Sequence, residues 1–467
     1  MSGVQTPRQI LADLWTSNGG DAADLDAVTL TGNEPVLPSS FRVDAIAQVT
    51  VAASALAAAA IWKARSGQSQ RVSVDMLHAA IECRSERHLR VEGKSLASIW
   101  DAIAGIYRTG DGGYVRLHTN FPLHRDNICK LLNCEPVRES VQAALMKWTG
   151  EAFETAAYAG GCVVSLMRNR KEWMATEHAK ALAALPLMTF EKIGDAPPRK
   201  WPSGDRPLAG LRVLDLSRVI AGPVAGRTLA AHGADVMLVA GPGLPSIPWL
   251  VIDTGRGKLS THIDLTSPAG KQTFEGLLSK ADIFSQGYRP QSLAGLGFSA
   301  QDAARINPGI VCLSLSAYGH SGPWSGRRGF DSLVQTSTGF NHAEGQAAGI
   351  EGPKELPMQI LDHATGYLMA FGAMMGRLRQ ASEGGSWQVR VSLAQTAHWL
   401  WNLGRIDGGL ATPEPSNEAV APLIETMPSG FGELQAVRHS AVLSATPAVW
   451  SRPSVPLGTH PPVWPSS

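Results

Sequence analysis

The sequence is poor in cysteine, and none of its cysteines is arranged as a pair. The five cysteines are scattered along the 467 residues, at Cys83, Cys129, Cys134, Cys162 and Cys312. They form no Cys-x-x-Cys pair and have no histidine at zinc-ligand spacing, so the sequence predicts neither a disulfide framework nor a bound metal. An odd number of isolated cysteines is typical of reduced thiols, and we therefore expect a cytoplasmic protein.

Net charge and long hydrophobic runs are also lacking. The chain has 41 Lys and Arg against 40 Asp and Glu, a formal charge of 41 − 40 = +1, which provides no electrostatic surface for nucleic acid or an anionic membrane. Residues 1–13 have no apolar core of the signal-peptide type. The longest apolar run, 49–62, is rich in alanine and too short to span a bilayer. We expect a buried helix there, and neither a membrane nor a nucleic-acid partner.

Several motifs of common enzyme classes are missing. The sequence contains no P-loop, no His-Glu-x-x-His and no Ser-His-Asp ordering. The loop 218–226 follows the first strand of an α/β region, where a dinucleotide-binding loop would lie, but Gly-x-Gly-x-x-Gly is absent. A Rossmann oxidoreductase that uses NAD is therefore disfavoured. The helix that follows still offers its N-terminus to a phosphate, and a tight packing turn is the alternative.

Strands and helices alternate regularly after Pro207. Strands are predicted at 211–216, 234–239, 260–264, 281–284 and 310–314, with helices at 225–232, 268–280 and 299–306. Such alternation indicates an α/β protein with a doubly wound, Rossmann-like parallel sheet, whose ligands bind outside the carboxyl ends of the strands.

Four regions are predicted along the chain. Residues 1–100 form an N-terminal helical unit, and residues 101–200 a smaller α+β domain that contains a hairpin over 106–118. Residues 207–410 form the large Rossmann-like domain, after a linker rich in Pro, Lys, Arg and Gly. Residues 411–467 are rich in proline and are predicted to be an extended C-terminal wrap, with an edge strand at 430–437.

A long-helix element occurs twice. A long apolar helix, a turn, a strand and a second helix are predicted within 42–87 and again within 362–403, with an offset of 389 − 72 = 317 residues between matching strand valines. In the first copy the position of Asp362 falls on Ala45, or on Asp44 if one residue is gapped. The Ala-Thr-Gly that follows Asp362 is also missing there. We expect the first, truncated copy to keep the fold element and not the chemistry.

Asp362 is the strongest candidate for a reactive group. It opens a long apolar helix, and Ala364 and Gly366 leave room beside it. The positive end of the helix dipole favours an ionised carboxylate, and such a carboxylate can act as a nucleophile. A helix N-cap is the alternative. Two loop residues are less specific: His320 could be an acid/base group or a surface residue, and Asp331 could be a cap.

Basic residues follow predicted strands at three places. They are Arg256 with Lys258, Arg289, and Arg327 with Arg328. Three basic sites on one side of a parallel sheet suit an anion that carries several phosphates. For any single one of these residues, a solvated surface charge is the alternative.

Together these residues resemble the class III CoA-transferase family, which includes carnitine, formyl and bile-acid CoA-transferases and a racemase branch that acts on α-methylacyl-CoA. The resemblance covers 207–405 and rests on Pro207–Leu216, Ala221-Gly222-Pro223, Gly233–Val236, Arg256-Gly257-Lys258, Asp264-Leu265, Tyr288-Arg289-Pro290, Gly322-Pro323 and Asp362–Gly366. Residues 107–112 resemble the family's second domain, and 444–460 its C-terminus. Each motif is weak alone, and the combination is specific.

The resemblance implies an acyl-CoA:carboxylate CoA-transferase. Asp362 matches the catalytic aspartate, which would carry CoA as an aspartyl-CoA thioester between an acyl-CoA and a small carboxylic acid. No metal and no permanently bound cofactor is implied, because CoA thioesters are the substrates. Asp331 falls near an acidic residue that assists in formyl-CoA transferases. The residues expected to bind CoA are Ala221, Gly222, Val239, Arg256, Lys258, Arg289, Tyr318 and Arg328.

Some features depart from the family pattern. Ile220 stands where formyl-CoA transferases have Gln, so help for the oxyanion must come from elsewhere, such as backbone N–H groups. Phe330 stands where the racemase branch has His, which argues against two-base racemisation. The small domain precedes the large one, so the chain resembles a truncated copy fused to a near-complete one, or a permuted member.

Two other functions remain open: a CoA-ester isomerase or racemase of the same family, and a non-catalytic CoA-binding subunit. Family members form interlocked homodimers, so we expect a homodimer. The alternative is that the fused small domain satisfies the same contacts within one chain.

Overall fold

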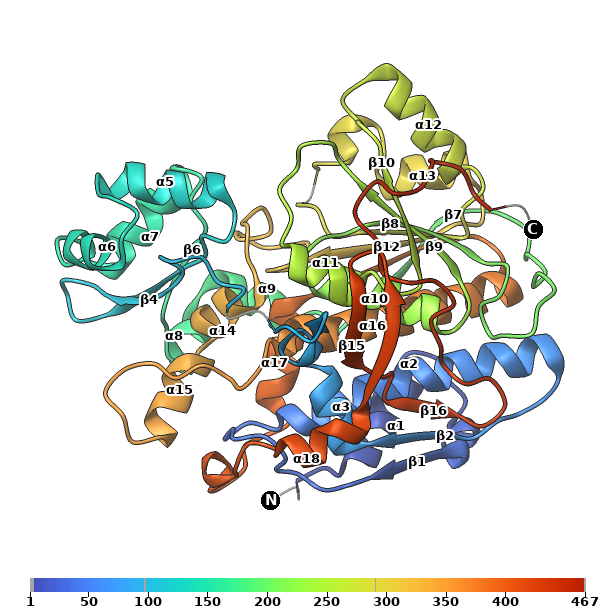
Figure 1. The fold of residues 1–467 in the computed structure, drawn as a ribbon, viewed down its shortest axis with the longest axis horizontal. Helices are drawn as coiled ribbons and strands as arrows, with labels where there is room; N and C mark the ends of the chain where they lie inside the picture. The colour runs from blue at the N-terminus through green and yellow to red at the C-terminus, as the bar shows by residue number, and fades with distance from the viewer. Residues whose placement is uncertain (1–3, 96–97, 290, 466–467) are drawn as a thin grey trace.

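A seven-stranded, mostly parallel sheet forms the centre of the large domain in the computed structural model (Figure 1). The structure describes residues 4–95, 98–289 and 291–465. The strands are β7 (Thr189–Gly194), β8 (Arg212–Leu216), β9 (Asp235–Ala240), β10 (Lys258–His262), β11 (Ile283–Gln286), β12 (Val311–Ser316) and β13 (Ser386–Ser392). Their order is β10-β9-β8-β11-β12-β13-β7, with β7 antiparallel to β13. The Rossmann-like α/β fold predicted from the sequence is confirmed.

The direction in which the sheet grows reverses between β8 and β11. From β8 the chain adds β9 and β10 on one side, and then crosses back to place β11 on the other side of β8. At such a switch point the crevice outside the carboxyl ends of the two strands is open, and doubly wound proteins bind their ligands there. The loops that begin at Ser217 and Gly287 therefore border the expected site.

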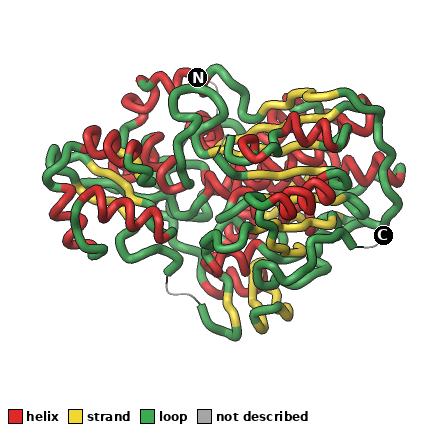
Figure 2. The backbone as a smooth tube through the Cα atoms, turned by 90° about the horizontal axis from the view of Figure 1, so that it is seen from above, coloured by secondary structure: helices red, strands yellow, loops and turns green. Residues whose placement is uncertain are grey.

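Helices cover both faces of the sheet. On one face lie α10 (Ala221–Ala231) and α16 (Ile360–Glu383), and on the other α12 (Pro268–Leu278) and α13 (Ala300–Ile306). Val213 and Val311 belong to the core beneath the first pair of helices, whereas Leu214 and Cys312 belong to the core beneath the second. Successive strand residues thus point to opposite, covered faces. Figure 2 shows the strands side by side with helices around them.

The predicted long-helix repeat is present in unbroken register. Its first copy is α2 (Val43–Ser66), β2 (Val72–Asp75) and α3 (Met76–Glu82), and its second is α16, β13 and α17 (Leu393–Asn402). Both long helices have 24 residues. The helix starts are 360 − 43 = 317 and 393 − 76 = 317 residues apart. Because the offset needs no gap, Asp362 corresponds to Ala45.

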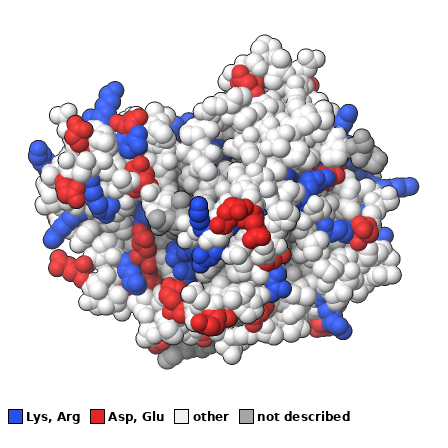
Figure 3. Space-filling model, viewed as in Figure 1, with Lys and Arg blue, Asp and Glu red and all other residues white. Residues whose placement is uncertain are grey.

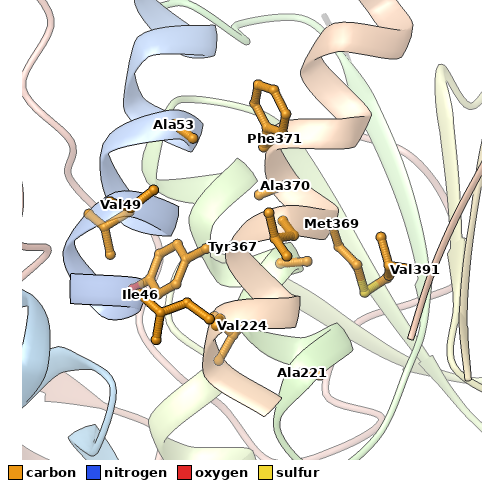
Figure 4. Packing of buried hydrophobic residues seen from close by; sticks show 14 of the residues in the cluster. Ile46, Val49, Ala53, Ala221, Val224, Tyr367, Met369, Ala370, Phe371 and Val391 are labelled. Carbon is orange, nitrogen blue, oxygen red and sulfur yellow. The ribbon is translucent and has the colours of Figure 1, made fainter. Parts of the chain in front are cut away.

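The two long helices of the repeat pack against each other inside the protein. In Figure 4, Ile46, Val49 and Ala53 of α2 lie beside Tyr367 and Phe371 of α16, and all five residues are buried. Helix α2 is longer than the apolar run suggested, and by length and hydropathy alone it could cross a membrane. However, 89% of its most apolar window is buried within the fold, as expected for a core helix.

Gly366 is a point of close contact between α16 and α10. A Cβ atom at this position would lie 2.5 Å from the carbonyl oxygen of Ala221 and 2.8 Å from Cβ of Val224. The glycine therefore makes room for a neighbouring helix. The interpretation that it leaves space for a ligand beside Asp362 was wrong.

Gly366→Ala is expected to lower the free energy of unfolding by about 1–3 kcal/mol, because the added methyl group overpacks the contact between α16 and α10. Urea unfolding followed by circular dichroism measures the change. The matched control is Gly276→Ala in α12, where a Cβ atom would meet nothing within 4 Å. That substitution is expected to stabilise the helix by about 0.5–1 kcal/mol. Equal midpoints for the two variants would contradict the close contact.

The small domain has its own sheet and apolar core. Its strands and helices are β4 (Gly105–Arg108), β5 (Tyr114–Leu117), β6 (Val164–Leu166), α5 (Pro122–Leu132), α6 (Arg138–Leu145) and α7 (Gly150–Ala159). The predicted hairpin is the β4–β5 pair. The domain ends earlier than 200, because β7 leaves it to pair with β13 in the large sheet. In Figure 1 the small domain lies to the left of the rest of the molecule.

The C-terminal region joins the N-terminal unit to the large domain. Its strands β14 (Ile424–Ser429) and β15 (Gly432–Val437) form a sheet with β3 (Arg90–Val91). Its strand β16 (Ala441–Leu443) pairs with β2, in a sheet that also contains β1 (Val28–Thr31). The strand expected at the edge is β15, which instead lies between β14 and β3. The remaining α-helices of the described residues are α1 (Pro7–Ser17), α4 (Ser85–His88), α8 (Arg170–Ala175), α9 (Glu177–Ala183), α11 (Pro248–Thr254), α14 (Asp331–Thr338), α15 (Phe340–Ala347) and α18 (Asn417–Val420).

Candidate active site

A cavity of about 450 Å³ opens at the switch point of the sheet. The loops that follow β8, β11 and β12 contribute to its wall, and α16 and the small domain complete it. Its wall includes Phe121, Leu123, His124, Arg218, Ala221, Arg289, Arg327, Arg328, Phe330 and Asp362. The cavity thus lies outside the carboxyl ends of the strands, where doubly wound proteins bind their ligands.

Asp362 is the carboxyl group that reaches this cavity. It is the third residue of α16 and is 7% exposed, whereas Asp331 is fully buried. Gln359 is the N-cap of α16 and makes no side-chain capping bond, so Asp362 is not the cap. A small exposed fraction at the cavity wall is enough for one carboxylate oxygen to meet a ligand, while the rest of the side chain is held by packing.

Asp331 is hydrogen-bonded on both sides and lies beneath Asp362. Its Oδ2 accepts the backbone N–H of Asp362 at 2.9 Å, and its Oδ1 accepts the amide of Gln335. Gln335 in turn accepts the backbone N–H of Leu356 at 3.1 Å. Asp331 therefore does not cap its own helix, α14. It satisfies a free N–H at the start of α16, and so fixes the position of Asp362.

The resting protonation state of Asp362 differs from the sequence prediction. Burial, followed by the negative charges of Asp331 and Glu86, raises its pKa well above the ordinary value. Burial also raises the pKa of Asp331 to about 6, although its hydrogen bonds oppose the shift. Two neighbouring carboxyl groups cannot both ionise freely, so one holds the proton. Asp331, with three hydrogen-bond donors, is the anion and Asp362 the protonated partner.

The N-terminal unit contributes a second buried pair at this helix start. Oε2 of Glu86, in α4, lies 3.2 Å from Nε2 of His363, and both side chains are almost fully buried. Burial would raise the pKa of Glu86, but the hydrogen bond to His363 brings it below its ordinary value. The N-terminal unit therefore supplies a charged residue that contacts His363, the neighbour of Asp362 in the chain.

Four arginines surround the cavity: Arg218, Arg289, Arg327 and Arg328. Within the described residues, Arg218, Arg289 and Arg328 form no ion pair, whereas Arg327 lies 3.7 Å from a carboxylate oxygen of Glu154. Burial, together with the charge of Arg289, lowers the pKa of Arg328. Uncompensated arginines in a partly buried cavity favour an anionic ligand. On the face shown in Figure 3, by contrast, acidic and basic side chains are mixed.

Arg256 and Lys258 do not reach the cavity, so the prediction that they meet nucleotide phosphates was wrong. Both side chains are buried. Arg256 lies 3.3 Å from Asp253 and stacks on Trp450 at 4.1 Å. Lys258 lies 2.9 Å from Asp215 beneath α10. These cations are already paired, and exposing them would leave buried carboxylates without a partner.

The other predicted CoA contacts divide between the cavity and the protein interior. Ala221 lines the cavity, and Val239 lines a slot of about 50 Å³ beside it. Gly222 packs on Ser217, and Tyr318 is buried with its carbonyl oxygen 2.6 Å from Nε2 of His178. Neither Gly222 nor Tyr318 belongs to the cavity wall. Pro290, part of the Tyr-Arg-Pro motif, lies outside the described residues.

His320 is not an acid/base group of the site. Its Nε2 lies 3.2 Å from the carbonyl oxygen of Ser314, a residue of β12, and burial lowers the pKa of the imidazole. The described residues include no cluster of three or more His, Cys, Asp or Glu side chains that could hold a metal.

Three cavity residues from the small domain were missed by sequence reasoning. Phe121, Leu123 and His124 lie at the start of α5 and face the large domain across the cavity. Leu123 is 60% exposed at the cavity mouth. The region of short helices that holds them carries no motif, so only the packing of the two domains reveals their role.

Fold and site define an α/β protein with a cavity at the switch point that is lined by arginines and, among the described residues, by the single carboxyl group of Asp362. The family model described as CoA-transferase family III matches residues 24–198 and 208–459. The chain belongs to CoA-transferase family III, and the resemblance noted in the sequence is confirmed.

Named relatives are CoA-transferases. An acyl-CoA transferase of Gibberella moniliformis is 26% identical over 83% of this chain and 75% of its own length. A succinyl-CoA:glutarate CoA-transferase of Mus musculus is 33% identical over 38% of this chain and 42% of its own length. A solved structure of a hypothetical protein from Mycobacterium tuberculosis is 30% identical, with a TM-score of 0.40, over 44% of this chain and 57% of that one. The chain thus spans three quarters of one relative and about half of the others.

Proposed function

We propose that this protein transfers CoA from an acyl-CoA to a small carboxylic acid through an aspartyl-CoA thioester on Asp362. The observation that carries the proposal is the position of Asp362: its carboxyl group reaches a cavity at the switch point that is surrounded by arginines. Relatives that are named as CoA-transferases support the reaction class.

The chemistry needs one carboxylate and no redox step. An oxygen of ionised Asp362 attacks the thioester carbonyl carbon, and the carbon–sulfur bond breaks, so that the CoA thiolate leaves with the electron pair. The product is a mixed anhydride. The thiolate then attacks the carbonyl carbon of Asp362, which releases the first carboxylic acid as its anion and leaves aspartyl-CoA. An acceptor carboxylate repeats the two steps in reverse order and regenerates Asp362.

The arginines have a matching role in this proposal. A CoA thioester carries a diphosphate and a 3′-phosphate, and Arg289 and Arg328 line the cavity without an ion-pair partner among the described residues. Guanidinium groups bind phosphate oxygens through paired N–H donors. Val239 and its neighbours form an apolar slot at the carboxyl ends of β8 and β9, which suits a flat ring. The acyl donor and the acceptor acid are open.

Trapping the intermediate tests the proposal. The protein is incubated with a panel of acyl-CoA donors, treated with hydroxylamine or borohydride, digested with trypsin and analysed by mass spectrometry. Modification of Asp362 is expected. Asp331 provides an internal control, because Lys354 places the two aspartates in different tryptic peptides. CoA binding without modification would indicate a binding subunit, and deuterium uptake at the acyl α-carbon a racemase.

The homodimer and the cytoplasmic location stay predictions from the sequence. Light scattering on the purified protein measures the first. The α2–α16 contact lies within one chain. It supports the alternative that the fused units make the contacts of the family dimer within a single chain, in which case a monomer would be observed.

A further inference from the structure

We infer that His124, on the small domain, donates a hydrogen bond to the acyl oxygen during the attack by Asp362. The inference rests on the proposed function and identifies a catalytic residue for it. The sequence left this task open, because Ile220 is apolar and backbone N–H groups were the suggested donors.

The position of His124 is set by the start of α5. It is the third residue of this helix, and its backbone N–H bonds to the carbonyl oxygen of Phe121 at 2.9 Å. Its ring packs edge-on against Phe121, with centroids 5.3 Å apart, and lies 6.1 Å from Phe330. Phe330 directly precedes Asp331, whose carboxylate holds the backbone of Asp362. His124 and Asp362 thus belong to the wall of one cavity, on opposite domains.

The imidazole is free to interact with a ligand. Nδ1 of His124 is shielded from solvent and has no hydrogen-bond partner among the described residues, so the donor that can face the cavity is the N–H at Nε2. By comparison, the rings of His178 and His363 already contact a carbonyl oxygen and a carboxylate.

The charges around His124 keep it neutral. Burial, then the positive charges of Arg328 and Arg218, lower its pKa to about 4. The positive end of α5 acts in the same direction. At neutral pH the ring therefore carries one N–H group, which makes it a hydrogen-bond donor and not a cation. A cation would pair with Asp362 and quench the nucleophile, whereas a neutral donor can polarise a carbonyl group and leave the carboxylate free.

This donor serves the step in which charge develops. When the Asp362 oxygen adds to the thioester carbonyl, the carbonyl oxygen becomes an oxyanion, and donors that are already oriented stabilise it. When the carbon–sulfur bond breaks, the electron pair returns to the carbonyl and the hydrogen bond weakens. No proton leaves His124 in this step, and the proton that Asp362 holds at rest is lost before its carboxylate attacks.

The test compares steady-state kinetics of four full-length proteins: wild type, His124→Phe, His124→Asn and His342→Gln. His124→Phe keeps the ring volume but removes the donor, and kcat is expected to fall by about 10²–10³-fold. KM for the acyl-CoA should change little, because the lost bond forms mainly in the transition state. His124→Asn keeps an N–H donor and is expected to recover part of the loss. His342, on α15, is the control and should behave like wild type.

The outcomes separate the inference from the proposed function. If wild type forms the Asp362 adduct and His124→Phe keeps kcat near wild type, or raises KM alone, the role of His124 is overturned. Equal losses for His124→Phe and His124→Asn, with unchanged unfolding midpoints, would also overturn it, because the donor would not matter. If wild type neither transfers CoA nor forms the adduct with any donor, both proposals fail.

Discussion

Replacing Asp362 with asparagine is expected to lower kcat for CoA transfer by at least about 10⁴-fold, the size of loss seen when a nucleophile is removed. An amide cannot attack a thioester, and the cavity offers no other carboxylate within the described residues that line it. Release of CoA from an acyl-CoA in the presence of an acceptor acid measures the rate. Binding of CoA should persist, since the arginines are unchanged. Turnover near the wild-type rate would remove the basis for the proposed reaction.

Asp44→Asn in the first copy of the repeat is the matched control. Asp44 is also buried near the start of a 24-residue helix, and burial raises its pKa to about 6. Its Oδ2, however, accepts the backbone N–H groups of Val36 and Leu37. Its role is therefore structural, and the variant should lose stability and keep its kcat.

Asp362→Asn should in addition be more stable than wild type at neutral pH, by about 0.5–2 kcal/mol. The raised pKa means that the folded protein holds a proton which the unfolded chain releases above the ordinary value of 3.8. Stability therefore falls as the pH rises from about 4 toward the folded pKa. Asparagine carries no such proton and avoids this loss. Thermal unfolding of both proteins at pH 5 and pH 8 measures the difference, which should be larger at pH 8.

Asp331→Asn is expected to move the acidic limb of the kcat/KM profile to lower pH. The charge of Asp331 is the second cause, after burial, of the raised pKa of Asp362. Without that charge Asp362 ionises at lower pH, and the reactive carboxylate is present where the wild-type group is still protonated. The plateau at high pH should fall by about tenfold, because asparagine cannot accept all the hydrogen bonds that Asp331 accepts.

Glu86→Gln offers a comparison for that shift. Glu86 also raises the pKa of Asp362, but its effect is smaller than that of Asp331. We therefore expect a shift in the same direction and of smaller size, with the His363 contact kept by the amide oxygen. A profile that stays in place in both variants, or moves to higher pH, would show that the two carboxylates do not control the ionisation of Asp362.

Local pattern was enough to predict the parts of the fold that follow from periodicity. The strands of the large sheet other than β7, and the two copies of the repeat, are visible because buried strands and apolar helices have their own sequence periods. The ends of the small domain and the order of the C-terminal strands were not predictable in this way. They depend on pairings such as β7 with β13 and β15 with β3, which join residues far apart in the chain.

Among the predicted site residues, loop position alone placed some at the cavity, whereas distant partners hold others in the interior. Arg289 and Arg328 follow strands and do line the cavity. Arg256 and Lys258 follow strands too, but Asp253 and Asp215 bind them in the interior. A helix start predicts an ionised aspartate by itself, yet burial and a carboxylate 31 residues away in sequence reverse that effect at Asp362.

The α2–α16 pair also bears on how this protein can change over time. In an assembly of identical chains, every substitution is made in all copies at once, so a residue cannot serve catalysis in one and scaffolding in another. Here the two copies are encoded separately, as Ala45 opposite Asp362 illustrates. Substitutions in α2 are therefore limited only by packing. Substitutions in α16 are limited by packing and by the chemistry as well.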